Sequence, residues 1–182
     1  AREKINRLLK GEGFIDERAL LEVEIQPSDK EPPASYYTLN DVAIARGAVA
    51  RVISVEAKMN GELLATYRGD GVIVATATGS TGYALAAGGP ILRPQSRDII
   101  LVPILPHLSL DYPLVLSSDT KLRFQVQSVH TATISIDGHT NLPAASGTVI
   151  NIKESQHTLR FIRMNPETYF YNTLERRLKG KV

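Results

Sequence analysis

The sequence predicts a mainly β, sandwich-like domain with a few short helices. Most apolar residues stand in short runs rich in Val, Ile and Leu, and several runs alternate with polar residues at a period of two. The dipeptides Asn60-Gly61 and Asp137-Gly138 separate pairs of such runs and are strong hairpin signals. A chain of 182 residues is long enough to bury one hydrophobic core, as a β-sandwich-like domain requires.

Residues 1–10 are predicted to form a helix, because apolar residues recur at i, i+3 and i+4 and Gly11 follows as a C-cap. No N-cap signal precedes this helix, and the chain opens on Ala rather than Met. The helix is therefore expected either to begin before Ala1 or to be a connector. Residues 13–182 are then expected to form the β-rich domain, including its C-terminal helix.

The remaining elements follow from alternation, β-branched runs and turn residues. A Pro-rich polar loop is expected at 26–35, a turn with a short helix at 78–89, and a final amphipathic helix at 169–178. The expected strands lie at 21–25, 36–45, 52–58, 63–68, 72–76, 99–103, 114–116, 121–126, 131–136, 148–153 and 158–164.

Composition excludes several kinds of chemistry. The absence of Cys removes disulfides, thiolate nucleophiles and zinc ribbons. Lys and Arg number 21 against 19 Asp and Glu, so the net charge of +2 gives no strong field for nucleic acid or membrane. No apolar run approaches the roughly 20 residues of a membrane span. The 4 histidines lack metal-ligand spacing, and no metal site is expected.

Residues 78–82 (Thr-Gly-Ser-Thr-Gly) are the first candidate ligand site, because they follow a buried strand and open a helix. The first turn of a helix presents unpaired N–H donors, and its glycines admit a ligand close to the backbone. Such a turn can hold a phosphate, a ribose or an amide edge, or it can be a capped helix packed closely on a sheet. Ser80 does not lie in a Gly-x-Ser-x-Gly elbow, which disfavours a hydrolase.

Two acidic positions also interrupt the expected pattern. Asn40-Asp41 lies within an otherwise apolar strand, although Asn and Asp are poor strand residues. A buried carboxylate there needs hydrogen-bond donors, so this position is either part of a site or a bulge or strand end. Asp70 lies between two glycines and is either a site residue or a turn residue.

The run from Gly69 to Ile91 resembles the signature of the NAD kinase family. The likeness extends to Leu39-Asn40-Asp41, residues 103–107, Asp137-Gly138 and Tyr171–Leu174, all in the same order. The resemblance implies the β-rich C-terminal domain of a cytoplasmic enzyme that phosphorylates the adenosine-ribose 2′-hydroxyl of NAD to give NADP. ATP or polyphosphate would be the donor, with a divalent metal (Mg²⁺), and the assembly would be a homodimer or homotetramer.

The family's catalytic Asp belongs to a Gly-Gly-Asp-Gly motif in an N-terminal α/β domain, and that motif is absent from these residues. The resemblance therefore implies that residues 1–12 are a linker helix from a missing N-terminal α/β domain. The isolated chain is therefore expected to be inactive, because phosphoryl transfer needs a phosphate cradle and a base as well as a positioned acceptor. Two alternatives remain open from sequence: a lipid or sugar kinase relative, and a non-catalytic β-rich module for ligand binding or assembly.

The resemblance also implies the residues that contact NAD. By position, Asn40 and Asp41 would bind the adenosine-ribose side, and Asp70 would reach the nicotinamide carboxamide from a neighbouring subunit. Further contacts would come from the adenine and ribose pocket and its wall (Thr81, Gly82, Tyr83, Ala84, Leu85 and Ala86) and from Arg51, Arg68 and His139. The chain departs from the usual family residues at Ala77, Gly82, Ala86, Tyr112 and His139.

Overall fold

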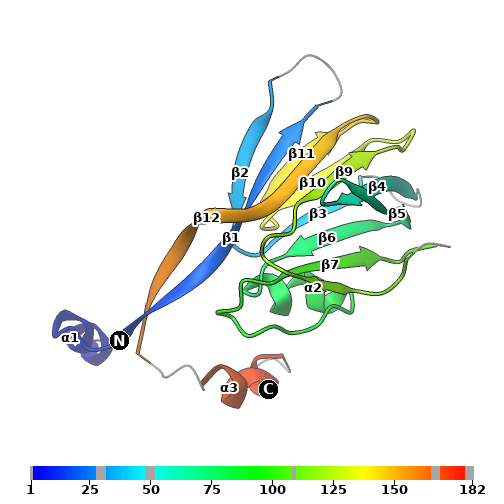
Figure 1. Ribbon diagram of the computed structural model, residues 1–182. Coiled ribbons are helices and arrows are strands. Elements are labelled where there is room, and N and C mark those ends of the chain that lie inside the picture. The colour runs from blue at the N-terminus through cyan, green and yellow to red at the C-terminus, as the bar shows by residue number, and fades with distance from the viewer. Residues whose placement is uncertain (1, 28–31, 48–51, 108–109, 165–168, 179–182) are drawn as a thin grey trace. The chain divides into compact units, whose positions relative to one another are not determined.

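A computed structural model of the chain describes residues 2–27, 32–47, 52–107, 110–164 and 169–178. Two six-stranded sheets contain most of these residues, and short helices account for part of the rest (Figure 1). The predicted mainly β, sandwich-like class is therefore confirmed.

Each sheet combines strands from distant parts of the chain. The first comprises β1 (Phe14–Gln26), β2 (Ala34–Thr38), β4 (Ile53–Met59), β5 (Glu62–Gly69), β9 (Leu122–Val126) and β12 (Val149–Arg163). The second comprises β3 (Asp41–Arg46), β6 (Gly71–Ala75), β7 (Ile99–Ile104), β8 (Leu114–Leu116), β10 (Ala132–Ile136) and β11 (Thr140–Ala144). The strand orders are β2-β1-β12-β9-β4-β5 and β11-β10-β3-β6-β7-β8. The helical elements are α1 (Arg2–Leu9), η1 (Gly79–Thr81), α2 (Tyr83–Ala86) and α3 (Tyr169–Leu178).

The main core lies between the two sheets and is built from alternate residues of their strands. Phe124 of the first sheet and Val42 and Ile134 of the second are completely buried in it. Each buried apolar side chain contributes roughly 1.5–3 kcal/mol, which fixes the register of every strand that has one polar face.

A second apolar cluster lies between α2 and the other face of the second sheet. It contains Ala43, Ile73, Ala75, Ala84, Ile100, Val102 and Ile104. β6 and β7 are therefore buried on both faces, which explains why their sequences are continuous apolar runs rather than alternating ones.

The strand expected at 36–45 is wrong as a single element. β2 ends at Thr38 in the first sheet, and β3 begins at Asp41 in the second. The chain crosses between the sheets at Leu39 and Asn40, so Asn40-Asp41 marks a strand end, one of the two alternatives considered from sequence.

Two further boundaries also differ from expectation. The strands expected at 148–153 and 158–164 form one long strand, β12. β11 was not expected, because Asn and Pro are poor strand residues; Pro143 is tolerated there because β11 lies at a sheet edge.

Contacts divide the chain into one unit of residues 18–159 and another of residues 1–17 with 160–182. In the smaller unit the ends of β1 and β12 are joined by ion pairs, Arg160 Nε to Glu17 Oε1 at 2.7 Å and Arg163 Nε to Asp16 Oδ2 at 3.2 Å. α1 and α3 lie where helices were expected, whereas the linker boundary at residue 12 stays a prediction. No helix in the described ranges is long and apolar enough to span a membrane.

Candidate functional site

The crossing from β2 to β3 is held by the carboxylate of Asp137 in the turn between β10 and β11. Its Oδ2 accepts a hydrogen bond from the Leu39 amide at 3.0 Å, and its Oδ1 accepts from the Asn40 and Asp41 amides at 2.7 and 3.2 Å. The Thr38 hydroxyl also donates to Oδ1. Burial opposes the charge of Asp137, but these hydrogen bonds outweigh it and lower its pKa. The ionised carboxylate therefore fixes the turn.

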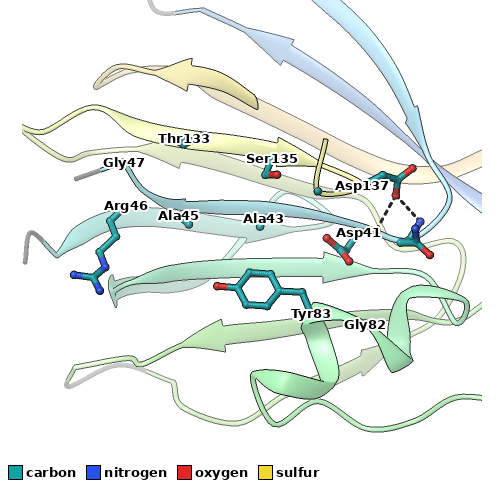
Figure 2. A pocket seen from close by; sticks show the side chains of 12 residues that line it. Asp41, Ala43, Ala45, Arg46, Gly47, Gly82, Tyr83, Thr133, Ser135 and Asp137 are labelled. Atoms are coloured by element: carbon teal, nitrogen blue, oxygen red, sulfur yellow. Dashed lines mark hydrogen bonds between the residues drawn. The ribbon is translucent and has the colours of Figure 1, made fainter. Parts of the chain in front are cut away.

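Asp41, the first residue of β3, presents a second carboxylate beside that turn. The residue is only 8% exposed, and Figure 2 shows its side chain directed into a pocket next to Tyr83. Burial, and secondarily the charge of Asp137, raises the pKa of Asp41 to about 6. Within the described ranges no group donates a hydrogen bond to this carboxylate. A ligand with hydroxyl or N–H donors would supply the missing partners.

The run at 78–82 packs directly on this turn. The Asn40 carbonyl accepts a hydrogen bond from the Thr76 amide at 2.9 Å, and the Thr76 hydroxyl donates to the Leu39 carbonyl at 2.5 Å. A Cβ at Gly79 would lie 2.1 Å from the Asn40 carbonyl oxygen. Glycine is therefore required at 79 by close backbone packing.

Ser80 has a structural role in the same run. Its side chain is fully buried, and its hydroxyl donates to the Ala77 carbonyl at 2.7 Å and accepts from the Leu92 amide at 3.1 Å. The hydroxyl thus ties η1 to the segment that follows α2, an arrangement that does not suit a nucleophile.

A cavity of about 570 Å³ opens over the outer face of β3 and β10. Its floor consists of small side chains in opposed pairs, with Ser135 opposite Ala43 and Thr133 opposite Ala45. Larger residues on these strands point the other way, into the main core. The other lining residues are Asn40, Asp41, Arg46, Gly47, Gly82, Tyr83, Asp137 and Gly138.

Arg46, the last residue of β3, carries a positive charge into the pocket at the end opposite the carboxylates (Figure 2). Its Nε lies 3.1 Å from Asp70 Oδ1, and its amide donates to the Asp70 carbonyl at 2.9 Å. Asp70 lies where the chain passes from β5 to β6, between the sheets. Gly71 has a φ of +149°, and a Cβ there would lie 2.2 Å from the Ile44 carbonyl oxygen, so the crossing requires glycine.

The sequence model of the ATP-NAD kinase C-terminal domain matches residues 39–164, which include the turn, the 78–82 run and the pocket. The chain belongs to the ATP-NAD kinase family. An NAD kinase of Dehalococcoides mccartyi (strain BAV1) is 49% identical over 176 residues, which are 97% of this chain and 62% of that protein. An NAD kinase of Chloroflexus aggregans is 38% identical over 173 residues, 95% of this chain and 62% of that protein. The chain therefore spans less than two thirds of the length of these relatives.

Two solved structures have a similar fold. The chain resembles an NAD kinase from Archaeoglobus fulgidus in complex with ATP, with a TM-score of 0.77 and 27% identity over 98% of this chain and 66% of that one. A yeast NADH kinase complexed with NADH shares the fold with a TM-score of 0.90, at 24% identity over 99% of this chain and 53% of that one.

Four residues expected from the family resemblance line the pocket together: Asn40, Asp41, Gly82 and Tyr83. Tyr83 is 47% exposed, so its ring offers a surface to a ligand. The other residues expected in the adenine and ribose wall do not line this cavity: Thr81 and Ala86 are exposed, Leu85 is half-buried, and Ala84 is buried where α2 packs on the second sheet.

The remaining expected residues do not line this cavity. Asp70, which was expected to act on the site of a neighbouring subunit, contacts Arg46 at the edge of the pocket of its own chain. The Nδ1 of His139 lies 3.1 Å from the Asp137 carbonyl in the adjoining turn. Arg68 is exposed on β5 of the first sheet and lines a separate hollow with Ser54 and Gln127. Arg51 lies outside the described residues.

Sequence reasoning missed several lining residues, above all Arg46, Thr133, Ser135 and the anchoring role of Asp137. Thr133 and Ser135 alternate with core residues and look like an ordinary solvent-facing row. Arg46 offered no signal beyond its place beside Gly47. Among the described residues, no group of three or more His, Asp or Glu side chains could hold a metal ion.

Proposed function

We propose that this chain is the NAD-binding and oligomerising domain of an NAD kinase. The intact enzyme would transfer a phosphate to the adenosine-ribose 2′-hydroxyl of NAD and release NADP. Membership of the family supports the reaction. The single observation that supports the site is the buried Asp41 carboxylate, directed into a pocket lined by residues of the family signature.

The pocket has the groups that a nucleoside needs. The Asp41 carboxylate can accept hydrogen bonds from ribose hydroxyls, and such charge-assisted bonds are worth roughly 1.5–3 kcal/mol. The side-chain carboxamide of Asn40 can both donate and accept hydrogen bonds at an adenine edge, and the Tyr83 ring offers a flat apolar face. The chain thus positions the phosphate acceptor.

The phosphate donor, ATP or polyphosphate, and a divalent metal such as Mg²⁺ would bind mainly to the part of the relatives that this chain does not span. The described residues do not form a metal site. A homodimer or homotetramer, a cytoplasmic location and a linker role for residues 1–12 complete the proposal.

The isolated chain is expected to bind NAD without converting it. Incubation with NAD, Mg²⁺ and either ATP or polyphosphate should give no NADP above background, because the sequence lacks the family's Gly-Gly-Asp-Gly motif. Calorimetry with NAD alone should still detect binding. Robust NADP formation would contradict the proposal that the donor binds outside this chain. No binding at millimolar NAD would favour a non-catalytic assembly module.

Asp41→Asn is expected to weaken NAD binding by at least about tenfold at pH 8 while making the fold more stable. The pKa of Asp41 is raised to about 6, so folding disfavours its ionised form. The resulting loss of folding stability is fully present above pH 6. It vanishes below pH 4, where Asp41 is protonated in both the folded and unfolded states. The variant should therefore melt higher than the wild type at pH 8 and equally at pH 4.

Thermal unfolding at pH 4, 6 and 8, with NAD titrations at pH 6 and 8, measures both effects. Asp111→Asn makes the same chemical change at an exposed position and should alter neither quantity. A lower melting temperature for Asp41→Asn at pH 8 would show that the carboxylate has partners in the folded state and would contradict the prediction.

A further inference from the structure

The pocket over β3 and β10 carries charges of opposite sign at its two ends. Asp41 and Asp137 lie at one end, and Arg46 lies at the other (Figure 2). Asp41 and Arg46 are the first and last residues of β3, so their Cα atoms are about 16 Å apart at a rise of about 3.3 Å per residue. The floor between them is neutral and carries only methyl and hydroxyl groups.

Arg46 is anchored at one edge of its guanidinium by Asp70. Its Nε contacts Asp70 Oδ1 at 3.1 Å, and the Asp70 amide is itself fixed by the Ile104 carbonyl at 3.0 Å. A guanidinium is planar and has donors along more than one edge, so a contact through Nε leaves the edge formed by the two terminal nitrogens for another acceptor. The Arg46 side chain is 36% exposed, which allows a ligand to reach it.

Among the described lining residues, Arg46 is the one cationic side chain. A dinucleotide carries its negative charge on the diphosphate and its hydroxyl donors on the riboses. The carboxylate end of the pocket attracts hydroxyl donors and repels phosphate, whereas a guanidinium matches phosphate oxygens in charge and geometry. The two ends therefore favour different parts of one ligand.

We propose that Arg46 binds the diphosphate of the dinucleotide and thereby fixes the direction in which the dinucleotide lies along the pocket. The adenosine ribose would lie at Asp41, and the phosphates would lie over the Ala45 and Thr133 floor within reach of Arg46. Asp70 acts here as a positioning residue that holds the guanidinium. This inference rests on the proposed function, because it takes NAD as the ligand.

Calorimetric titration of the chain with NAD and with adenosine tests the proposal in the wild type and in Arg46→Met. Methionine keeps much of the length of the side chain but removes its charge. NAD binding should weaken about 10- to 100-fold, the usual loss for charge-assisted hydrogen bonds, while adenosine binding changes by less than about twofold. Raising the salt concentration should weaken NAD binding to the wild type more than to the variant.

Lys153→Met is the matched control, since it removes one positive charge on β12 of the first sheet, where the lysine pairs with Glu22. It should leave both titrations unchanged. Arg46→Lys should recover part of the NAD affinity, because an ammonium keeps the charge but loses the planar fork. These results together would support a direct phosphate contact.

Two outcomes overturn the proposal in different ways. If Arg46→Met binds NAD as tightly as the wild type, or loses adenosine as severely as NAD, the diphosphate contact is wrong while the proposed function stands. If the wild-type chain binds neither NAD nor adenosine, the proposed function and this inference both fail.

Discussion

Asp137→Ala is expected to destabilise the fold by roughly 2–4 kcal/mol, since the substitution leaves the Thr38 hydroxyl and three backbone amides without their shared acceptor. For a chain of this size that loss lowers the melting temperature by about 5–15 °C. NAD binding should be lost as well, because the freed turn carries Asn40 and Asp41. Thermal unfolding at pH 8 and an NAD titration measure the two effects.

The ionised carboxylate of Asp137 stabilises the fold, whereas that of Asp41 destabilises it, so the two contributions to stability depend on pH with opposite signs. The pKa of Asp137 is lowered, so its contribution is fully present above the unfolded pKa of about 3.9 and is lost as pH falls through the folded value. The gap between the wild type and Asp137→Ala should therefore narrow below pH 4. Asp111→Ala, at an exposed position, is the control and should melt like the wild type at every pH. An equal melting temperature for Asp137→Ala and Asp111→Ala at pH 8 would refute the anchoring role.

The parts of the fold that sequence predicts are those fixed by local chemistry. Asn60-Gly61 and Asp137-Gly138 both adopt positive φ values, as hairpin turns of this kind require. The first turn has two residues, and the second has three because Ile136 pairs with Thr140. The alternation of 131–136 and the apolar run of 72–76 correctly place β10 and β6, because each pattern reports directly which faces are buried.

The site depends on contacts that no local pattern encodes. Asp137 is 96 residues from Asp41 in sequence, and only the antiparallel pairing of β10 with β3 brings its carboxylate to the turn. The crossing at Leu39 and Asn40 looked like a continuous strand because the apolar residues on both sides fit one pattern, although they belong to different sheets. Family resemblance supplied Asn40, Asp41, Gly82 and Tyr83, but not the residues whose smallness opens the floor.

At the other end of the pocket, the contacts of Arg46 are likewise not encoded in any local sequence pattern. An arginine at a strand end normally reads as a solvated charge, and nothing in its neighbours distinguishes it from the other basic residues. What distinguishes Arg46 is its contact with Asp70, at the point where the chain passes from β5 to β6, and the sequence does not reveal that contact. Residues that position a ligand through distant partners are therefore the ones that sequence reasoning is least able to find.

Gly79→Ala is expected to remove roughly 3 kcal/mol of stability and to abolish NAD binding. The added Cβ would lie 2.1 Å from the Asn40 carbonyl oxygen, 2.5 Å from the Asn40 carbonyl carbon and 2.8 Å from its Cα. All three atoms are backbone, so no rotamer change relieves the overlap, and the 78–82 run must separate from the turn that carries Asp41. Thermal unfolding and NAD titration measure the two losses.

Gly82→Ala is the matched comparison, because it adds the same methyl group three residues later in the same run. There the nearest neighbours of the added Cβ are the Gly79 carbonyl oxygen at 3.2 Å and Asp41 Oδ2 at 3.7 Å, contacts that a shift of a few tenths of an ångström can relieve. Its cost should be about 1 kcal/mol, with NAD binding retained. If Gly79→Ala proved no more damaging than Gly82→Ala, the contact between the 78–82 run and the Asn40 turn would not be what holds Asp41 at the pocket.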